Sequence, residues 1–541
     1  MSLLAPARTA EAAAMLEAAA LPEPAATPQG GRGPLGPIAL SLSGGGYRAA
    51  GFHLGVLKLL DEAGLLGSVA ALSTVSGGTI VGARWVRGLL DGEPFAEFSA
   101  GFADFLRRTN VVREALATLT ERDGGAAHPS LIRAAARVYA SPAVVGERRL
   151  GEVLDAPHLP LEEVIFNATE FHSGVDFRFR RSRNPAAVIG NGHFRVPRPV
   201  AAEVRLADVV AASSCFPSVF EPFLFPDHFA WPAAFPLERV RGELGEGFAG
   251  GLPLMDGGVY DNQGVASLLL AYAGPEPPPL LLISDTSPPE DNLYPDYPAP
   301  RPRGFLTLRA VAWLGRLVFV LSLASAVMLV IAGAEEVREE GFSFGELLLY
   351  GIPFVFTGGV AAGLLWLRRV MGEVEKQLRA QVQIARVWSY LRKLTVMDLI
   401  TLVETRVTSL LALTASIFMK RIRGLVFNTV FRDERYDRRR VPNLIYGLTL
   451  DHRKLFEAHP WLRPGERLQQ LARDASAVPT TLWVDTEEQL AQLVDAGYAT
   501  TCFSLLRHLV GDPEEAWRRP GSPAAELYER LRETWRRLNG T

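Results

Sequence analysis

Short apolar runs alternate with glycine turns and helical stretches in the first part of the chain. Ile38–Leu42 is an apolar run of strand type, followed by a glycine break and a helical stretch over Tyr47–Gly64. Val69–Val75 is a second such run, followed by a glycine turn and a helical stretch over Thr79–Leu90. This repeated order predicts an α/β fold with a mainly parallel sheet flanked by helices. Two more strands are predicted at Val164–Thr169 and Leu280–Ser284.

Two much longer apolar runs follow. Leu317–Ala334 holds 18 residues without a charge, and Leu347–Leu367 holds 21. Each is close to the ~20 residues that a helix needs to cross a ~30 Å hydrocarbon layer. The connection, Glu335–Glu346, is short and acidic. We therefore predict a transmembrane helical hairpin within 310–370. The alternative is a pair of buried core helices, which is less favoured because such helices usually keep a polar stripe.

Cations flank the two runs on their outer sides. Flanks rich in Arg and Lys stay on the cytoplasmic side of a membrane, so both large soluble portions are predicted to be cytoplasmic. Only five of the 56 cationic residues are lysine, which indicates the codon usage of a GC-rich, bacterial source. The predicted location is thus the bacterial inner membrane. The flanking cations are Arg301, Arg303, Arg309 and Arg316 before the first run, and Arg368, Arg369, Lys376 and Arg379 after the second.

Composition excludes several other classes of protein. The chain has 541 residues, 48% of them hydrophobic and 21% charged, which excludes a disordered chain. A net charge of −3 provides no global basic field for nucleic acid. Cys215 and Cys502 lie far apart and match no metal-ligand spacing, so neither a metal site nor a disulfide framework is predicted.

Three consecutive glycines, Gly44, Gly45 and Gly46, stand between the first strand and its helix. Backbone N–H groups in such a loop attract anions, either phosphates or a developing oxyanion. The loop also fits a G-x-G-x-x-A dinucleotide pattern ending at Ala49. A dinucleotide site needs an acidic residue after the next strand, and Ser76 stands there instead. The Gly-Lys-Ser/Thr ending of a Walker loop is also missing, so nucleotide binding is not favoured.

Ser76 occupies the position of a nucleophile elbow, between a strand and a helix, and it is followed by Gly77 and Gly78. An ordinary glycine turn is the alternative for this motif alone. A serine hydroxyl needs an adjacent base. None of the nine histidines has the context of a catalytic triad. Asp256, at the end of an apolar run and before two glycines, is the better candidate, although it also fits an Asp-Gly turn. Asp285 is the competing acid.

Five blocks, in order, resemble the patatin-like phospholipase family over about Ile38 to Thr286. The resemblance implies a three-layer α/β/α sandwich and strengthens the assignment of Ser76 considerably. The blocks are Gly44-Gly45-Gly46-Tyr47-Arg48, Ser76-Gly77-Gly78, Asn167-Ala168-Thr169-Glu170, Ala212-Ser213-Ser214-Cys215-Phe216-Pro217 and Asp256-Gly257-Gly258.

The resemblance implies a Ser–Asp dyad that requires no histidine, metal or cofactor. Ser76 would attack an acyl ester carbonyl while Asp256 takes its proton, and Asp256 would then activate water to release the acyl group. The other implied site residues are Gly44, Gly45, Gly46 and Arg48 at the oxyanion hole, where Arg48 steadies the loop, and Gly77, Gly78, Gly257 and Gly258 as supports of the two turns.

The predicted function is that of a membrane-associated serine lipid acyl hydrolase of the phospholipase A or lysophospholipase type. Its partners would be the lipid bilayer and an acyl-ester lipid within it, and not nucleic acid. A catalytically silent membrane scaffold or lipid-binding module is the alternative, and an acyltransferase would use the same dyad. The predicted parts are an Ala/Pro/Gly-rich segment (1–37), a catalytic domain (38–300), the hairpin (310–370) and a helical C-terminal region packed on the catalytic domain (371–541).

Within that last region, Met397–Met419 carries too many charges for a third span and predicts an amphipathic helix that packs on the domain. A local basic region follows. It fits a solvated face or a contact with anionic lipid headgroups. Its cations are Lys420, Arg421, Arg423, Arg432, Arg435, Arg438, Arg439 and Arg440.

Overall fold

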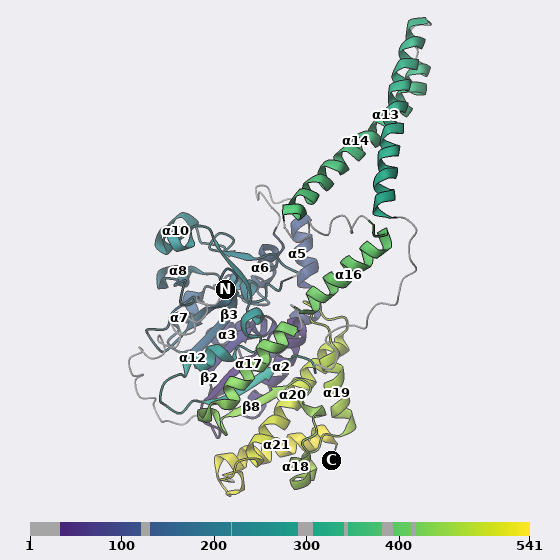
Figure 1. Cartoon of the computed structure of the whole chain (residues 1–541). Coiled ribbons are helices and arrows are strands. Elements are labelled where there is room, and N and C mark those ends of the chain that lie inside the picture. Colours follow the sequence, from purple (N-terminus) through teal and green to yellow (C-terminus); the bar gives the residue numbers. More distant parts are fainter. Residues whose placement is uncertain are drawn as a thin grey trace. The chain divides into compact units, whose positions relative to one another are not determined.

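The computed structural model (Figure 1) divides the chain into two compact units. The first unit comprises residues 1–291 and 417–541, and the second comprises 292–416. The N-terminal segment, predicted over 1–37, lies outside the described residues as far as residue 32. The structure describes residues 33–120, 130–217, 219–289, 307–339, 344–380, 393–413, 417–514 and 516–540.

The first unit is built on a mixed eight-stranded sheet in the order β5-β6-β3-β2-β1-β7-β8, with β4 paired to β3. The strands from β3 to β8 along this order are parallel, whereas β4, β5 and β6 pair antiparallel. The parallel core agrees with the predicted strands. The bounds are β1 Ile38–Leu42, β2 Val69–Val75, β3 Glu163–Glu170, β4 Val175–Arg181, β5 Phe223–Phe225, β6 Leu252–Asp256, β7 Leu280–Asp285 and β8 Arg440–Leu444.

Helices cover both faces of this sheet. Alternate residues of each strand point to opposite sides, and apolar side chains on both sides are buried beneath these helices. Ile38, Leu40 and Leu42 of β1 belong to the larger core, whereas Ala39 belongs to a smaller core on the other face. Both predicted helices next to the glycine turns are present. The helices before residue 290 are α2 Gly46–Glu62, α3 Gly77–Asp91, α4 Phe95–Arg108, α5 Val111–Thr120, α6 Leu131–Tyr139, α7 Leu150–Leu154, α8 Arg198–Glu203, α9 Leu206–Ser213, α10 Leu237–Leu244, α11 Gly258–Asp261 and α12 Val265–Ala271.

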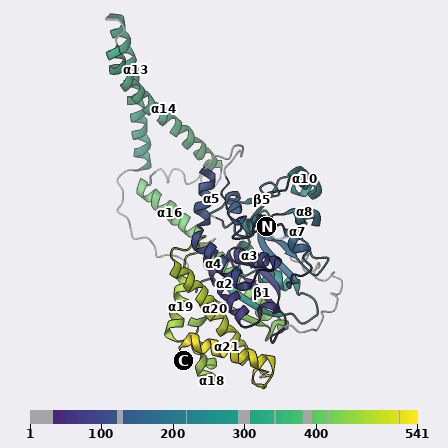
Figure 2. The ribbon, with the colours of Figure 1, turned by 180° about the vertical axis from the view of Figure 1, so that it is seen from behind.

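The C-terminal part of the chain completes this unit. Its strand β8 pairs with β7, so a region predicted as helical also supplies an outer strand of the sheet. Its long helix α20 lies along α2 (Figures 1 and 2). A Cβ added at Gly55 would lie 1.9 Å from the Val494 oxygen, and one at Gly497 would lie 1.9 Å from the Phe52 oxygen. The two helix backbones are therefore in direct contact. The helices are α17 Phe418–Arg432, α18 Arg453–Ala458, α19 Glu466–Ala477, α20 Glu487–Val510 and α21 Pro523–Asn539.

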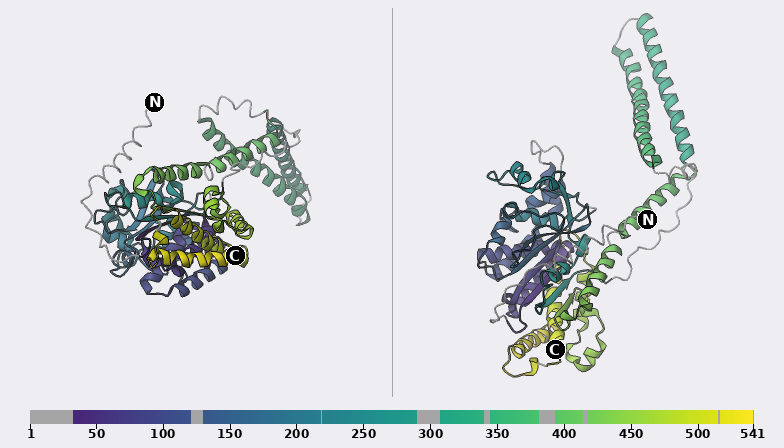
Figure 3. Two further views of the ribbon diagram at one scale, coloured as in Figure 1. Left: turned by 90° about the horizontal axis from the view of Figure 1, so that it is seen from below. Right: turned by 60° about the vertical axis from the view of Figure 1, so that its left-hand side comes forward.

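The second unit contains two long helices that pack against each other, α13 (Leu308–Glu339) and α14 (Phe344–Ala380) (Figure 3). In α13, Arg309–Glu335 is long and apolar enough to cross a membrane, with a mean hydropathy of 2.6 and 6% of its most apolar stretch buried. The apolar part of α14, Gly351–Trp366, is shorter. The described residues thus provide one candidate span by length and composition. Arg301, Arg303 and residues 340–343 of the predicted connection lie outside them.

In the range Met397–Met419, predicted as an amphipathic helix, every described residue is helical, and residues 414–416 lie outside the described residues. The structure divides this range between α16 (Val396–Ala412), in the second unit, and α17, in the first unit. In α16 the side chains of Ile400, Val403 and Leu410 are exposed.

Candidate active site

Ser76 forms the tight turn between β2 and α3. Its φ of 52° and ψ of −119° place a non-glycine residue in a strained backbone region, at a cost of about 1–3 kcal/mol. The Ser76 N–H donates to the Ser213 hydroxyl oxygen at 3.0 Å, and the Ser76 carbonyl accepts the Thr79 N–H at 2.8 Å. Ser76 is 8% exposed. This strained geometry is that of a nucleophile elbow, in which the serine stands at the tip of the turn.

Asp256 ends β6 and is almost fully buried. The Gly258 N–H donates to its Oδ1 at 2.8 Å, and the Ser76 side chain interacts with its carboxyl group. Burial raises the pKa of Asp256 to about 6, and the interactions with Ser76 and with the Gly258 N–H act against that rise by favouring the charged form. The structure therefore brings the two predicted dyad residues together, although they are far apart in the sequence.

The three-glycine loop lies against the elbow. A Cβ added at Gly44 would lie 3.1 Å from the Ser76 Cβ. The Gly44 N–H already donates to the Asn262 oxygen at 2.9 Å. In the described part of the chain, the N–H groups of Gly45 and Gly46 have no acceptor, and they open the N-terminus of α2. Two backbone donors thus stay available next to the serine.

Arg48 points its guanidinium toward the C-terminal part of the chain. It is buried, and its Nη1 donates to the Val478 oxygen at 2.9 Å. One residue earlier, the Tyr47 N–H donates to the Thr481 oxygen at 2.7 Å. Residues 478–481 therefore hold the start of α2 in place, and Arg48 acts on the glycine loop through this anchor.

The four glycines predicted to support the turns all stand where backbones or polar side chains approach closely. At Gly77 an added Cβ would lie 2.0 Å from the Gly46 oxygen, so the elbow and the glycine loop touch. At each of the other three positions a side chain would also collide with an oxygen atom. The distances are 2.3 Å at Gly78 to the Leu42 oxygen, 2.4 Å at Gly257 to the Asn167 oxygen and 2.6 Å at Gly258 to Asn262 Oδ1.

A buried network of side chains supports both ends of the dyad. The Asn167 Nδ2 donates to the Thr74 oxygen at 2.9 Å, just before the elbow. The Ser213 hydroxyl donates to the Asn167 oxygen at 2.6 Å and accepts the Ser76 N–H. The Thr169 hydroxyl donates to the Asp256 oxygen at 2.8 Å. Residues of the sequence blocks 167–170 and 212–217 thus hold Ser76 and Asp256 in position through buried hydrogen bonds.

The competing acid Asp285 and the buried histidine His53 have other partners. Asp285 is fully buried and pairs with Arg423, whose Nε lies 2.8 Å from Asp285 Oδ2. The His53 ring bridges Ser284 and Ser43, and burial lowers the pKa of His53 to about 4, so it is neutral. Among the described residues, no histidine forms a hydrogen bond with Ser76 or Asp256.

Sequence reasoning missed two residues that shape the site. The backbone oxygen of Asn262 accepts the Gly44 N–H. Its side-chain Oδ1 lies against both glycine turns: a Cβ added at Gly44 would lie 2.4 Å from this oxygen, and one added at Gly258 would lie 2.6 Å from it. Its position six residues after Asp256 was the only signal in the sequence that could have indicated a role at the site. Thr481 holds the start of α2 but belongs to the distant C-terminal part, and no local pattern marks it.

An α/β domain with a serine at a strained strand-to-helix turn, beside free backbone donors, has the architecture of a serine hydrolase. Residues 40–269 match the family model described as patatin-like phospholipase. The chain therefore carries a patatin-like phospholipase domain over these residues, as the five blocks predicted. The matched range includes both Ser76 and Asp256. A search among curated proteins finds no match.

Proposed function

We propose that this protein is a membrane-associated serine lipid acyl hydrolase of the phospholipase A or lysophospholipase type, with Ser76 and Asp256 as its dyad. The observation that carries the proposal is the interaction of the Ser76 side chain with the buried Asp256 carboxyl group, at an elbow next to free backbone donors. A buried carboxylate with a raised pKa is a stronger base than an exposed one, which suits proton removal from serine.

The chemistry runs through an acyl-enzyme. Asp256 takes the hydroxyl proton as Ser76 Oγ attacks the ester carbonyl, and the N–H groups of Gly45 and Gly46 stabilise the developing oxyanion. The N-termini of α2 and α3 add their positive ends to the same place. The protonated Asp256 then gives its proton to the leaving alkoxide. Water, deprotonated by Asp256, attacks the acyl-enzyme and releases the fatty acid.

The second unit is the proposed membrane anchor. Large apolar side chains are exposed along α13 and α14, among them Met328, Phe356 and Trp366, at 65%, 72% and 67%. Exposed apolar surface on this scale suits a hydrocarbon environment. The two helices would form a hairpin in the bacterial inner membrane, with the catalytic unit on the cytoplasmic side beside its acyl-ester substrate.

A serine-reactive fluorophosphonate tests the proposed nucleophile. We expect it to label the wild-type protein and to leave Ser76→Ala unlabelled, as read by in-gel fluorescence. Ser41→Ala is the matched control, because Ser41 is also buried near the end of a sheet strand but its hydroxyl has no hydrogen-bond partner among the described residues. Equal labelling of Ser76→Ala and wild type would exclude Ser76 as the nucleophile. No labelling of the wild type would favour the lipid-binding scaffold.

The pKa of Asp256 predicts the pH dependence of the reaction. Asp256 must be ionised to accept the serine proton, and its pKa lies at about 6. We therefore expect kcat/KM for a soluble ester to level off above about pH 7 and to fall roughly tenfold per pH unit below 6. Circular dichroism at each pH controls for unfolding. A rate that stays constant down to pH 4.5 would contradict Asp256 as the base.

A further inference from the structure

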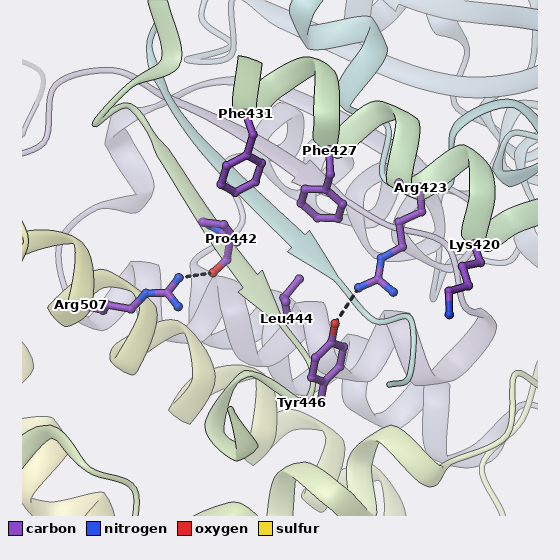
Figure 4. A pocket seen from close by; sticks show the side chains of 9 residues that line it. Lys420, Arg423, Phe427, Phe431, Pro442, Leu444, Tyr446 and Arg507 are labelled. Carbon is purple, nitrogen blue, oxygen red and sulfur yellow. Dashed lines mark hydrogen bonds between the residues drawn. The ribbon is translucent and has the colours of Figure 1, made fainter. Parts of the chain in front are cut away.

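A pocket lies between α17 and β8 in the first unit, and neither Ser76 nor Asp256 is among its lining residues (Figure 4). Its volume of about 440 Å³ falls within the ~300–1,000 Å³ typical of small-molecule sites. The walls between its two ends are mostly apolar. Phe427 and Phe431 point into it from α17, and Pro442 and Leu444 face them from β8. Such walls suit an apolar ligand or the apolar part of one.

Both ends of this pocket carry cations (Figure 4). Lys420 and Arg423 stand at one end. Arg423 is held there by its ion pair with Asp285 and by a hydrogen bond of 3.1 Å from its Nη2 to the Tyr446 hydroxyl. The charge of Arg423 is therefore already balanced by the protein. None of the described residues that line the pocket carries a carboxylate.

Arg507, at the other end, is different. It extends from α20, and its guanidinium donates to the Pro442 oxygen and to His452 Nε2, both at 3.1 Å. Neither acceptor carries a negative charge. Within the range of residues that the structure describes, no carboxylate lies within ion-pair distance of Arg507. Partial burial of a guanidinium without a counter-ion costs desolvation free energy, and an anionic group in the pocket would offset that cost.

We propose that this pocket binds a long-chain fatty acid, with the carboxylate on Arg507 and the acyl chain between Phe427, Phe431 and Leu444. A small inorganic anion would leave the apolar walls uncovered, and a neutral lipid would leave the Arg507 charge unbalanced. The source of the ligand rests on the proposed function, because a fatty acid is the product of acyl-ester hydrolysis. The binding itself does not depend on Ser76.

A photoreactive fatty acid tests the site on the full-length protein. The Ser76→Ala background separates binding from turnover, so that this experiment can succeed or fail independently of the hydrolase assignment. A diazirine-bearing oleic acid analogue is irradiated with the protein, and the modified peptides are mapped by mass spectrometry. We expect labelling in α17 and β8 that excess oleate removes and inorganic phosphate leaves unchanged.

Substitutions within the pocket complete the test. Arg507→Met should reduce this labelling at least tenfold, whereas Arg473→Met, which removes an exposed arginine of α19, should leave it within twofold. Phe431→Ala removes a half-exposed wall residue that the fold tolerates, and it should reduce labelling several-fold if Arg507→Met does not fold. The proposal would be overturned if Arg507→Met were labelled as strongly as Arg473→Met, or Phe431→Ala as strongly as its parent. It would also be overturned if the labelled peptides lay outside α17 and β8, or if phosphate competed with the label.

Discussion

Replacing Asp256 by asparagine should lower kcat/KM for acyl-ester hydrolysis by about 10²–10⁴-fold, the usual contribution of a positioned general base. The amide keeps the shape of the carboxylate, and its oxygen still accepts the Gly258 N–H that now lies 2.8 Å from Oδ1. It cannot take the Ser76 proton. The residual rate should also lose its dependence on pH near 6, because the group that titrates there is gone. Steady-state kinetics over a pH series measures both effects.

Asp261 offers a matched control for this substitution. It is also buried and lies only five residues further along the chain, but its carboxylate accepts the backbone N–H groups of Gln263 and Ala266, at 3.0 and 2.7 Å. Asp261→Asn should therefore stay within tenfold of the wild type and keep its pH profile. If Asp256→Asn retained most of the wild-type rate, or if both variants lost activity equally, Asp256 would not be the base.

The sequence predicted the parts of the site that depend on local chemistry. A tight strand-to-helix turn requires small neighbours, so Gly77 and Gly78 mark the elbow at Ser76 by their residue type alone. The three-glycine loop and the glycines after Asp256 are visible for the same reason. Each of these signals lies within a few residues of the group that it positions, and the order of the five blocks along the chain identified the family.

The contacts that join distant segments were not predictable in this way. Val478 and Thr481 hold the start of α2 through backbone oxygens, and a backbone acceptor has no signature in the amino-acid sequence. The strand β8 contains Pro442 and only two buried residues, so it does not read as part of a buried parallel sheet. The direct contact of α2 with α20 depends on Gly55 and Gly497, which singly look like weak points of two helices.

Truncation of the chain at residue 291 should abolish folding, even though this piece holds the whole match to the family. It would remove β8 from β7 and uncover the face of α2 that packs against α20, including the close approach of Gly55 to the Val494 oxygen. It would also leave the fully buried Asp285 without Arg423, and removing one partner of a buried ion pair costs about 3–5 kcal/mol. We expect an aggregated product without a cooperative thermal transition.

Excision of the second unit should have the opposite outcome. Joining residue 289 to residue 417 through ten Gly and Ser residues provides about 17 Å of reach. The ends to be joined are close, because Asp285 contacts Arg423 and the six residues from 417 to 423 rise about 9 Å along the helix. The shortened protein should melt cooperatively and react with a fluorophosphonate. It should also hydrolyse a soluble short-chain ester within about tenfold of the full chain.

The shortened protein should also lose the membrane attachment proposed for α13 and α14. Co-sedimentation with phospholipid vesicles measures this loss, with the full-length protein as the reference. A shortened protein that still sediments with vesicles would place the membrane contact in the first unit, where the cations of α17 lie. One that fails to fold would show that residues 292–416 contribute to the core. Membrane attachment and catalysis are separable only if the shortened protein folds, reacts and remains in solution.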